Sequence, residues 1–580
     1  MIDVNGGQII AQVLSQYGVA QLYTLCGGHI SPIYVEAEKA GIRIVDVRDE
    51  ASAVFGADAS ARITGIPGVA AVTAGPGVTN AITALKNAQM AQTPLLLIGG
   101  ATATLLRGRG ALQDIDQIAL VRPHVKLAQR VTRLRDMAPT LHRALAVAQS
   151  GVPGPVFLEM PIDLLYDESE VRKMYGQKAT PGKKLSDKAL NWYIQRHVNR
   201  LFSGVTPASI TASAPAIAPE SAIPAHTLRQ TLAALQKATR PLLVISSGAL
   251  LSPTLAPHIA DAIRSLGVPV YLSGMARGLL GQSDPLQYRH QRKQALREAD
   301  CILLLGVPCD FRLDYGQQLN RKAFKIAVSR SHSDLHKNIK ANLTVQTDPG
   351  RWLNALAQAT PSLPDWSSWK SDLKLRETNR ENEIDGTAAQ EVAYINPVAL
   401  FRALDTALPN SSILIADGGD FAATAAYTLR PRKPLSWLDP GVFGTLGVGG
   451  GFAMGAALHF PDDYVWIIYG DGRAAYSLME MDTFRKSGFK VCAIIGNNGS
   501  WEQIARDQVP MLGRDTATVL PRSDYHKIAE AFGAAGERVE SIDSFREAVA
   551  RAIQSMDNGI PYVINAVIGS TAFRQGSISM

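Results

Sequence analysis

Two short apolar runs, each ending in polar residues, restrict the fold of this chain more than any other feature. Residues 465–469 and 491–495 are rich in β-branched and aromatic side chains, which predicts buried strands. The first run ends at a GDG motif containing Asp471 and the second at Asn497 and Asn498, with 24 residues between Gly472 and Asn497. Because that gap holds one helix and its return, we expect neighbouring parallel strands whose polar ends lie at the same sheet edge.

These strand ends carry ligands that suit magnesium. Asp471 offers a carboxylate and Asn498 an amide oxygen, and Mg²⁺ completes its roughly six oxygen ligands with water and phosphate. Gly472 has no side chain to block a diphosphate, and the helix that follows would offer it free N–H groups. The alternative is that Asp471 caps a helix and the asparagines form a turn. The presence of both motifs at this separation favours the metal site.

At these residues the chain resembles the thiamine diphosphate enzymes, whose signature is GDG followed at this kind of spacing by NN. The resemblance implies that Asp471, Asn498 and the backbone carbonyl of Ser500 hold Mg²⁺. It also implies that Leu446, in the GTLG turn, wedges between the two rings of the cofactor. Further cofactor contacts are expected from Gly419, Asp420, Phe421, Gly444, Gly472 and Arg473, and a substrate contact from Trp501.

The N-terminal part of the chain supplies the predicted catalytic residues. In the resembling family a glutamate placed like Glu50 hydrogen-bonds N1′ of the aminopyrimidine, although a carboxylate at this turn can also cap a helix. Asn80 is expected beside the cofactor, and Gln113, in RGRGALQ, beside the reacting carbon, as in the acetolactate synthase group. His29 is a candidate for proton transfer because its ordinary pKa lies near neutrality, and a structural hydrogen bond is an equally good reading. Asp49 replaces the histidine often found before this glutamate.

Helical and strand-like patterns alternate through most of the 580 residues, which predicts an α/β fold with mostly parallel sheets. Polar, Ala-, Pro- and Ser-rich stretches divide the chain into three such domains. The order matches the resembling family and gives a pyrimidine-binding domain at 1–165, a linker at 166–226, a central domain at 227–363, a linker at 364–394 and a diphosphate-binding domain at 395–580.

Composition excludes several other classes of protein. The net charge of +7 is spread along the chain and forms no basic stripe, so nucleic-acid binding is not expected. No run has the roughly 18 apolar residues of a membrane helix, and the N-terminus lacks the features of a signal peptide. We therefore predict a cytoplasmic protein. Its four cysteines have no CxxC spacing and lie mostly in apolar runs, which favours reduced core thiols over zinc or disulfides.

The central segment favours one of two reactions of the resembling family. MARGLL, RHQRKQAL and LDYG look like the branch that acts on CoA thioesters, and Arg277, Arg292 and Lys293 would meet phosphates of CoA or an ADP-like effector. A solvated basic helix face is the alternative. The tail TAFRQGSISM resembles that of 2-hydroxyacyl-CoA lyases, with Arg574 as a substrate contact; the alternative is a frayed terminus.

The sequence therefore predicts a Mg²⁺- and thiamine diphosphate-dependent lyase that cleaves a 2-hydroxyacyl-CoA to an aldehyde and formyl-CoA, or joins them in reverse. An acetolactate synthase-like enzyme acting on 2-oxoacids and an inactive regulatory subunit are the alternatives. The architecture implies a homodimer or homotetramer with active sites between subunits. FAD or ADP in the central domain is compatible with the pattern but is not predicted.

Overall fold

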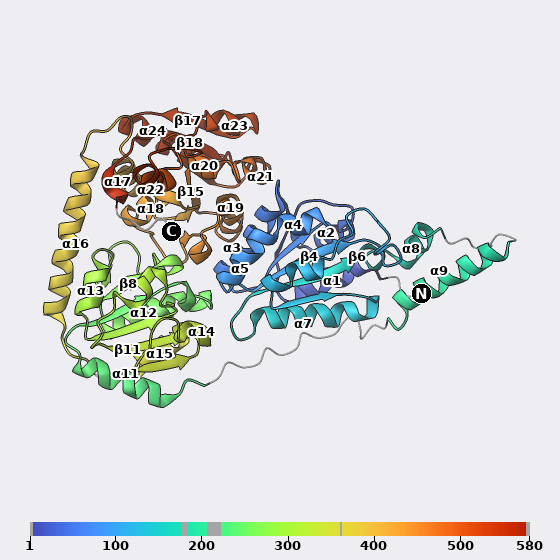
Figure 1. Ribbon diagram of the computed structural model, residues 1–580, viewed down its shortest axis with the longest axis horizontal. Coiled ribbons are helices and arrows are strands. Elements are labelled where there is room, and N and C mark those ends of the chain that lie inside the picture. The colour runs from blue at the N-terminus through green and yellow to red at the C-terminus, as the bar shows by residue number, and fades with distance from the viewer. Residues whose placement is uncertain (1–3, 177–183, 206–221, 360–361, 576–580) are drawn as a thin grey trace. The chain divides into compact units, whose positions relative to one another are not determined.

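The computed structural model describes residues 4–176, 184–205, 222–359 and 362–575. Its strands form three six-stranded sheets in which every strand pair is parallel (Figure 1). The predicted fold class, three doubly wound α/β domains, is confirmed. The chain divides into two compact units, one of residues 1–61 with 66–218, and one of residues 219–580 with 62–65. The second unit therefore contains two of the three sheets.

The first unit contains a sheet with the strand order β2-β1-β3-β4-β6-β5. Asn5 begins the first helix with a capping box, in which its side chain accepts from Gln8 N–H at 2.9 Å and its own N–H donates to Gln8 at 3.2 Å. Apolar residues of α1, α2 and α7 cover one face of the sheet. The elements are β1 (Gln21–Thr24), β2 (Arg43–Asp46), β3 (Gly68–Val72), β4 (Leu95–Ala101), β5 (Leu127–Arg130), β6 (Pro155–Pro161), α1 (Gly6–Gln16), α2 (Ser31–Lys39), α3 (Glu50–Thr64), α4 (Pro76–Asn80), α5 (Ile82–Met90), α6 (Gln117–Val121), α7 (Met137–Gln149), α8 (Glu168–Met174) and α9 (Leu185–Phe202).

The second sheet has the strand order β12-β11-β10-β7-β8-β9. Its central strands β7 and β10 are wholly buried, as expected for parallel strands covered by helices on both faces. The elements are β7 (Pro241–Ile245), β8 (Val270–Leu272), β9 (Gln287–Tyr288), β10 (Cys301–Leu305), β11 (Phe324–Ser329), β12 (Leu343–Gln346), α11 (Ala225–Lys237), α12 (Ala256–Leu266), α13 (Arg292–Glu298), α14 (His332–Leu335), α15 (Pro349–Gln358) and α16 (Ser367–Ala388).

The third sheet has the strand order β14-β13-β15-β16-β18-β17 and contains the two runs that restrict the fold. Both are strands, as predicted, and they pair in parallel with Gly470 opposite Gly496. The GDG and NN motifs therefore follow neighbouring strand ends. The elements are β13 (Ser412–Ala416), β14 (Trp437–Leu438), β15 (Tyr464–Gly470), β16 (Val491–Asn497), β17 (Ala535–Val539), β18 (Tyr562–Val567), α17 (Pro397–Ala407), α18 (Gly419–Thr428), α19 (Val448–His459), α20 (Asp471–Ala474), α21 (Met481–Ser487), α22 (Glu502–Leu512), α23 (Tyr525–Ala531) and α24 (Ile542–Asp557).

Both stretches predicted as linkers contain helices. The described part of 166–226 holds α8 and α9, while residues 177–183 and 206–221 lie outside the described residues. Most of 364–394 is the single 22-residue helix α16, yellow in Figure 1. The helix is mostly polar, and only three of its side chains are buried, those of Trp369, Leu373 and Ile384. Such a sparse apolar pattern explains why the sequence did not predict this helix.

All four cysteines are free, and Cys301, Cys309 and Cys492 are buried. Cys26 differs from the other three because it is exposed in the turn that follows β1. The residues that the structure describes include no helix that is long and apolar enough to cross a membrane.

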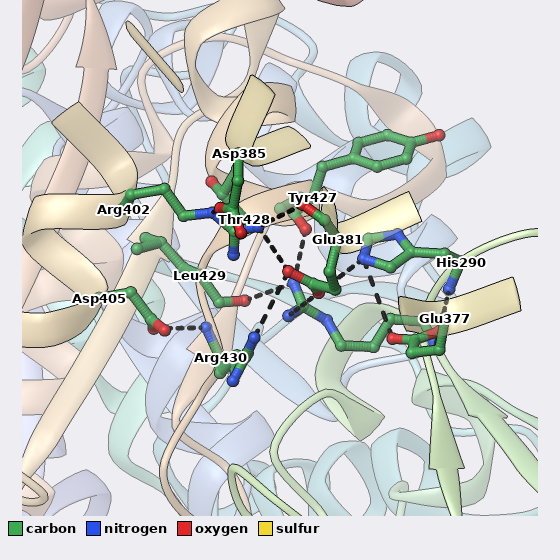
Figure 2. A network of polar contacts seen from close by, with 12 residues as sticks. His290, Glu377, Glu381, Asp385, Arg402, Asp405, Tyr427, Thr428, Leu429 and Arg430 are labelled. Carbon is green, nitrogen blue, oxygen red and sulfur yellow. Dashed lines mark hydrogen bonds and ion pairs between the residues drawn. The ribbon is translucent and has the colours of Figure 1, made fainter. Parts of the chain in front are cut away.

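An ion network on α16 joins the second and third sheets' domains within the second unit (Figure 2). Glu381 accepts a hydrogen bond from His290 Nε2 at 2.8 Å and one from Arg402 at 2.5 Å, and Arg430 lies 3.5 Å away. One turn earlier, Glu377 accepts the backbone N–H groups of residues 289 and 290 at 3.0 Å. Burial works to raise the pKa of Glu381, but the bonds from His290 and Arg402 outweigh it and hold that pKa well below its usual range.

We expect Glu381→Gln to destabilise the second unit by about 3 kcal/mol, because it leaves partly buried arginines without their anion. In a chain of this size that lowers the melting temperature by several degrees. Glu383→Gln is the matched control, since Glu383 lies on the same helix but is 58% exposed in its pair with Arg380; its effect should stay below about 1 kcal/mol. Equal shifts for the two variants in thermal unfolding would show that the network adds no stability.

Candidate functional site

A cavity of about 290 Å³ opens at the carboxyl edge of the third sheet, where the ends of β13, β15, β16 and β18 meet. We call it the Asp471 pocket. In parallel sheets ligands bind at this edge. The pocket brings together eleven residues that the sequence predicted as functional, namely Gly419, Asp420, Phe421, Gly444, Asp471, Gly472, Arg473, Asn498, Ser500, Trp501 and Arg574.

Asp471 is almost fully buried, and backbone N–H groups surround its carboxylate. One oxygen accepts from Gly472 at 2.8 Å, and the other accepts from Gly499 at 2.7 Å and Ser500 at 3.3 Å. Across the ranges that the structure describes, no lysine or arginine forms an ion pair with it, and burial raises its pKa. A buried carboxylate without a cation is costly, so the site fits a bound metal ion.

Asn498 lies next to this carboxylate. Its side-chain oxygen accepts from Ser500 N–H at 3.1 Å, the same N–H that lies 3.3 Å from Asp471 Oδ2. Its side-chain nitrogen donates to Glu502 at 3.0 Å. Two oxygens of the kind that Mg²⁺ prefers therefore approach the same Ser500 N–H group.

Gly472 packs closely against Trp501, a contact that the sequence did not reveal. A Cβ atom there would lie 2.6 Å from the Trp501 ring, so the indole occupies the space that a side chain would need. The Gly472 N–H is already bonded to Asp471, and α20 is only four residues long. The free helix N-terminus expected after the GDG motif is therefore a single short turn.

Charged side chains form another wall of the Asp471 pocket. Asp420, in the first turn of α18, pairs with Arg506 of α22, and Arg574 lies 4.0 Å away. Arg473 packs against Gly418 and Gly419, where a Cβ atom would lie 2.5 and 2.8 Å from its guanidinium. The C-terminal segment thus reaches this wall through Arg574, while residues 576–580 of the predicted tail lie outside the described residues.

The GTLG turn is held by Asp417, which the sequence did not single out for a role. This fully buried carboxylate accepts from the N–H groups of Gly447 at 3.1 Å and Gly449 at 2.7 Å, and Arg473 lies 3.9 Å away. Burial raises the pKa of Asp417 to about 6. The half-buried Leu446 lies within the turn but does not line the Asp471 pocket. In the sequence, the role of Asp417 was indicated only by its position between an apolar run and two glycines.

The predicted residues of the first unit lie at the carboxyl edge of its own sheet. Glu50 begins α3, is 7% exposed, and accepts from Asn80 Nδ2 at 3.1 Å. Asp49 accepts the Ala51 N–H at the start of the helix, so the capping role belongs to Asp49 and leaves the Glu50 carboxylate turned to Asn80.

His29 and Gln113 occupy separate places along this edge. His29 Nδ1 lies 3.3 Å from Thr73 Oγ1, and burial lowers its pKa. Gln113 has a left-handed backbone, with φ of 64°, and lines a cavity of about 250 Å³ that also includes Arg130 and Glu159. Thr73, the partner of His29, and the Glu50 carboxylate both lie beside Gly77, where a Cβ atom would be 3.0 Å from Thr73 Cγ2 and 3.4 Å from Glu50 Oε1.

A third cavity, about 460 Å³, lies at the other end of α18. We call it the cationic cavity because, among the described residues, no carboxylate lines it and five positive side chains do: Arg277, Arg289, Arg292, Lys293 and Arg380. Arg277 donates to the carbonyl of Ala426 at 2.7 Å, and Arg292 donates to that of Arg312 at 2.7 Å. Burial lowers the pKa of both guanidinium groups, and the neighbouring Arg277 lowers that of Arg292 further, so a bound anion would stabilise their charged forms.

One further group has metal-ligand chemistry. Ligand atoms of His290, Glu377 and Glu381 lie within 4.8 Å of one another. Glu381 is already neutralised by Arg402 and Arg430, and the network of Figure 2 leaves it no charge for a metal ion. This cluster is a structural junction.

Comparison with known proteins agrees with the three domains. The chain matches three family models: thiamine pyrophosphate enzyme, N-terminal TPP binding domain, over residues 4–120; central domain, over 228–356; and C-terminal TPP binding domain, over 417–566. It is 46% identical to 2-hydroxyacyl-CoA lyase 2 of Danio rerio over 99% of this chain and 93% of the relative, and 46% identical to that of Homo sapiens over 99% and 92%. It is 29% identical to a probable acetolactate synthase of Mycobacterium bovis over 97% and 96%.

The raised pKa of Asp417 predicts a pH dependence of stability. Because the folded state binds this proton more tightly than the unfolded state, ionisation destabilises the fold above about pH 6 and the effect is relieved as pH falls. Relative to Asp417→Asn, the wild type should therefore gain about 1 kcal/mol of unfolding free energy between about pH 7.5 and about pH 5. Urea denaturation of both proteins at each pH measures this, and a difference that does not change with pH would contradict it.

Proposed function

The chain belongs to the thiamine pyrophosphate enzyme family, and on this basis we propose that it is a Mg²⁺-dependent carbon–carbon lyase that converts a 2-hydroxyacyl-CoA to an aldehyde and formyl-CoA, reversibly. The observation that carries the proposal is the similarity to 2-hydroxyacyl-CoA lyase 2 proteins over the whole chain, which exceeds the similarity to the acetolactate synthase. The cationic cavity supports it, because a CoA thioester carries phosphates and a 2-oxoacid does not.

Thiamine diphosphate, when bound, supplies the ring that stabilises negative charge while the bond between the hydroxyl-bearing carbon and the thioester carbon breaks. Asp471, Asn498 and the Ser500 carbonyl would hold the Mg²⁺ that binds the diphosphate. Gly419, Gly472 and Arg473 would contact the phosphate groups, with Asp420 and Phe421 completing the wall.

The remaining predicted residues would act on the reacting groups. Glu50, oriented by Asn80, would hydrogen-bond N1′ of the aminopyrimidine, while Leu446 and the backbone of Gly444 would hold the cofactor bent. His29 would take the proton of the substrate hydroxyl group, since its lowered pKa leaves the imidazole neutral and able to accept it. Gln113 would contact the reacting carbon, and Trp501 and Arg574 the substrate.

The phosphates of CoA are assigned to the cationic cavity, chiefly to Arg277, Arg292 and Lys293. The ten-residue helix α18 separates this cavity from the Asp471 pocket, a span of about 15 Å. An extended pantetheine arm is of comparable length. We also propose a homodimer or homotetramer, since in this family the glutamate and the metal site that share a cofactor come from different subunits.

The reaction is tested with purified protein, thiamine diphosphate, Mg²⁺ and a panel of 2-hydroxyacyl-CoA thioesters beside pyruvate. We expect aldehyde and formyl-CoA from the thioesters. Acetolactate from pyruvate without aldehyde from any thioester would replace the proposal with the synthase alternative. Cofactor binding without turnover of either substrate would favour a regulatory subunit.

Glu50→Gln should lower kcat for thioester cleavage about a hundredfold or more, because an amide cannot exchange a proton with the pyrimidine as a carboxyl group does. Cofactor binding should change far less. Asp49→Asn is the matched control, since its side chain only caps α3. Unchanged kcat in Glu50→Gln would remove this residue from the mechanism.

Lys293→Ala should raise KM for a CoA thioester about fivefold, the effect of losing about 1 kcal/mol from one exposed phosphate contact. KM for a truncated thioester that lacks the nucleotide should not change. Arg297→Ala removes a charge from the same helix, α13, outside the cavity and serves as control. Equal KM changes for both thioesters would place the phosphates elsewhere.

A further inference from the structure

The amide of Asn498 can face a metal ion with either its oxygen or its nitrogen, and only the first orientation allows it to bind the ion. Its oxygen and nitrogen ends have nearly the same shape, but only the oxygen ligates a cation. In the structure the nitrogen donates to Glu502 Oε2 at 3.0 Å, while the oxygen meets the Ser500 N–H that also approaches Asp471. Something in the protein must enforce this orientation when a cation binds.

Glu502 has the chemistry to do so. An ionised carboxylate only accepts hydrogen bonds, so the nitrogen end of Asn498 must face it. Ser570 Oγ, from the C-terminal segment, lies 3.3 Å from the same carboxylate oxygen. No ion pair found among the described residues includes Glu502, and Arg506, one turn further along α22, pairs with Asp420 instead.

Two hydrogen bonds fix the backbone immediately before Glu502. Gly499 accepts the Leu520 N–H at 2.8 Å, and Trp501 N–H donates to Thr518 at 2.8 Å. Glu502 follows directly as the first residue of α22 and lines the Asp471 pocket. Its carboxylate is therefore held beside Asn498 by local structure, and it does not need the cofactor to bring it there.

We propose that Glu502 is a positioning residue that directs the Asn498 amide oxygen to the metal ion and makes that oxygen a stronger ligand. This inference rests on the Mg²⁺ site of the proposed function. The negative charge on the nitrogen side of the amide increases electron density on the oxygen, as partners of metal ligands do elsewhere. Glu502 itself contacts neither metal nor substrate in this role.

The test measures Mn²⁺ binding by electron paramagnetic resonance in the presence of thiamine diphosphate, so turnover is not needed. We expect Glu502→Ala to weaken Mn²⁺ binding about ten- to a hundredfold. Glu502→Gln, which can still present an oxygen to Asn498 but carries no charge, should restore only part of the affinity. Asp507→Asn removes a carboxylate from the same helix outside the pocket and should leave the affinity unchanged.

Testing Glu502→Ala in an Asn498→Asp variant distinguishes an effect on the orientation of the Asn498 amide from a general loss of structure. In Asn498→Asp both side-chain ends are oxygens, so no orientation needs to be enforced, and Glu502 becomes an unfavourable neighbouring charge. Adding Glu502→Ala to Asn498→Asp should therefore strengthen Mn²⁺ binding, the reverse of its effect on the wild type. Weakening in both backgrounds would overturn the proposal, as would full affinity in the single Glu502→Ala variant. If the wild type binds no Mn²⁺, the metal site of the proposed function fails instead.

Discussion

The proposed chemistry depends on Asp471, a buried carboxylate that pairs with no lysine or arginine among the described residues. Asp471 lies at a sheet edge because β15 and β16 pair in register, and three backbone N–H groups hold it there. Those bonds stabilise the charge only in part, since burial still raises the pKa of the group. The neighbouring Asn498 adds a second oxygen at the same place. A divalent cation with a bound diphosphate completes such a site, whereas an apolar ligand would leave the charge buried and unpaired.

Helix α18 connects this site with the cationic cavity. Its first turn carries Asp420 at the wall of the Asp471 pocket, and its last carbonyls accept hydrogen bonds from Arg277 and Arg289. Cations at a helix C-terminus are favourable, so the arginines are stabilised there before any anion arrives. Glu381 also holds His290, which Figure 2 shows, by a hydrogen bond of 2.8 Å. Arg289 lies 3.8 Å from the same carboxylate. The two ends of one helix thus border two cavities, an arrangement that would suit the proposed substrate with its reactive end and its distant phosphates.

The sequence predicted the fold and the residues of the main pocket because those signals are local. A β-branched run that ends in GDG or NN indicates both a strand and the polar residues at its end, all within a few positions. Contacts between distant residues left no such pattern. Gly472 packs against a tryptophan 29 positions later, and Asp417 binds a turn 30 residues away. Helix α16 buries only three of its side chains. The role of Glu502 depends on which end of an amide it meets. The magnesium ion, the subunit arrangement and the cytoplasmic location stay predictions.

Calorimetric titration with thiamine diphosphate tests whether Asp471 holds the metal ion that binds the cofactor's diphosphate. Wild-type protein should bind thiamine diphosphate tightly with Mg²⁺ present and far more weakly after chelation. Asp471→Asn, which keeps the shape of the side chain but removes its charge, should lose this dependence on Mg²⁺ together with most of the affinity. Binding by Asp471→Asn with the affinity and metal dependence of the wild type would contradict the account.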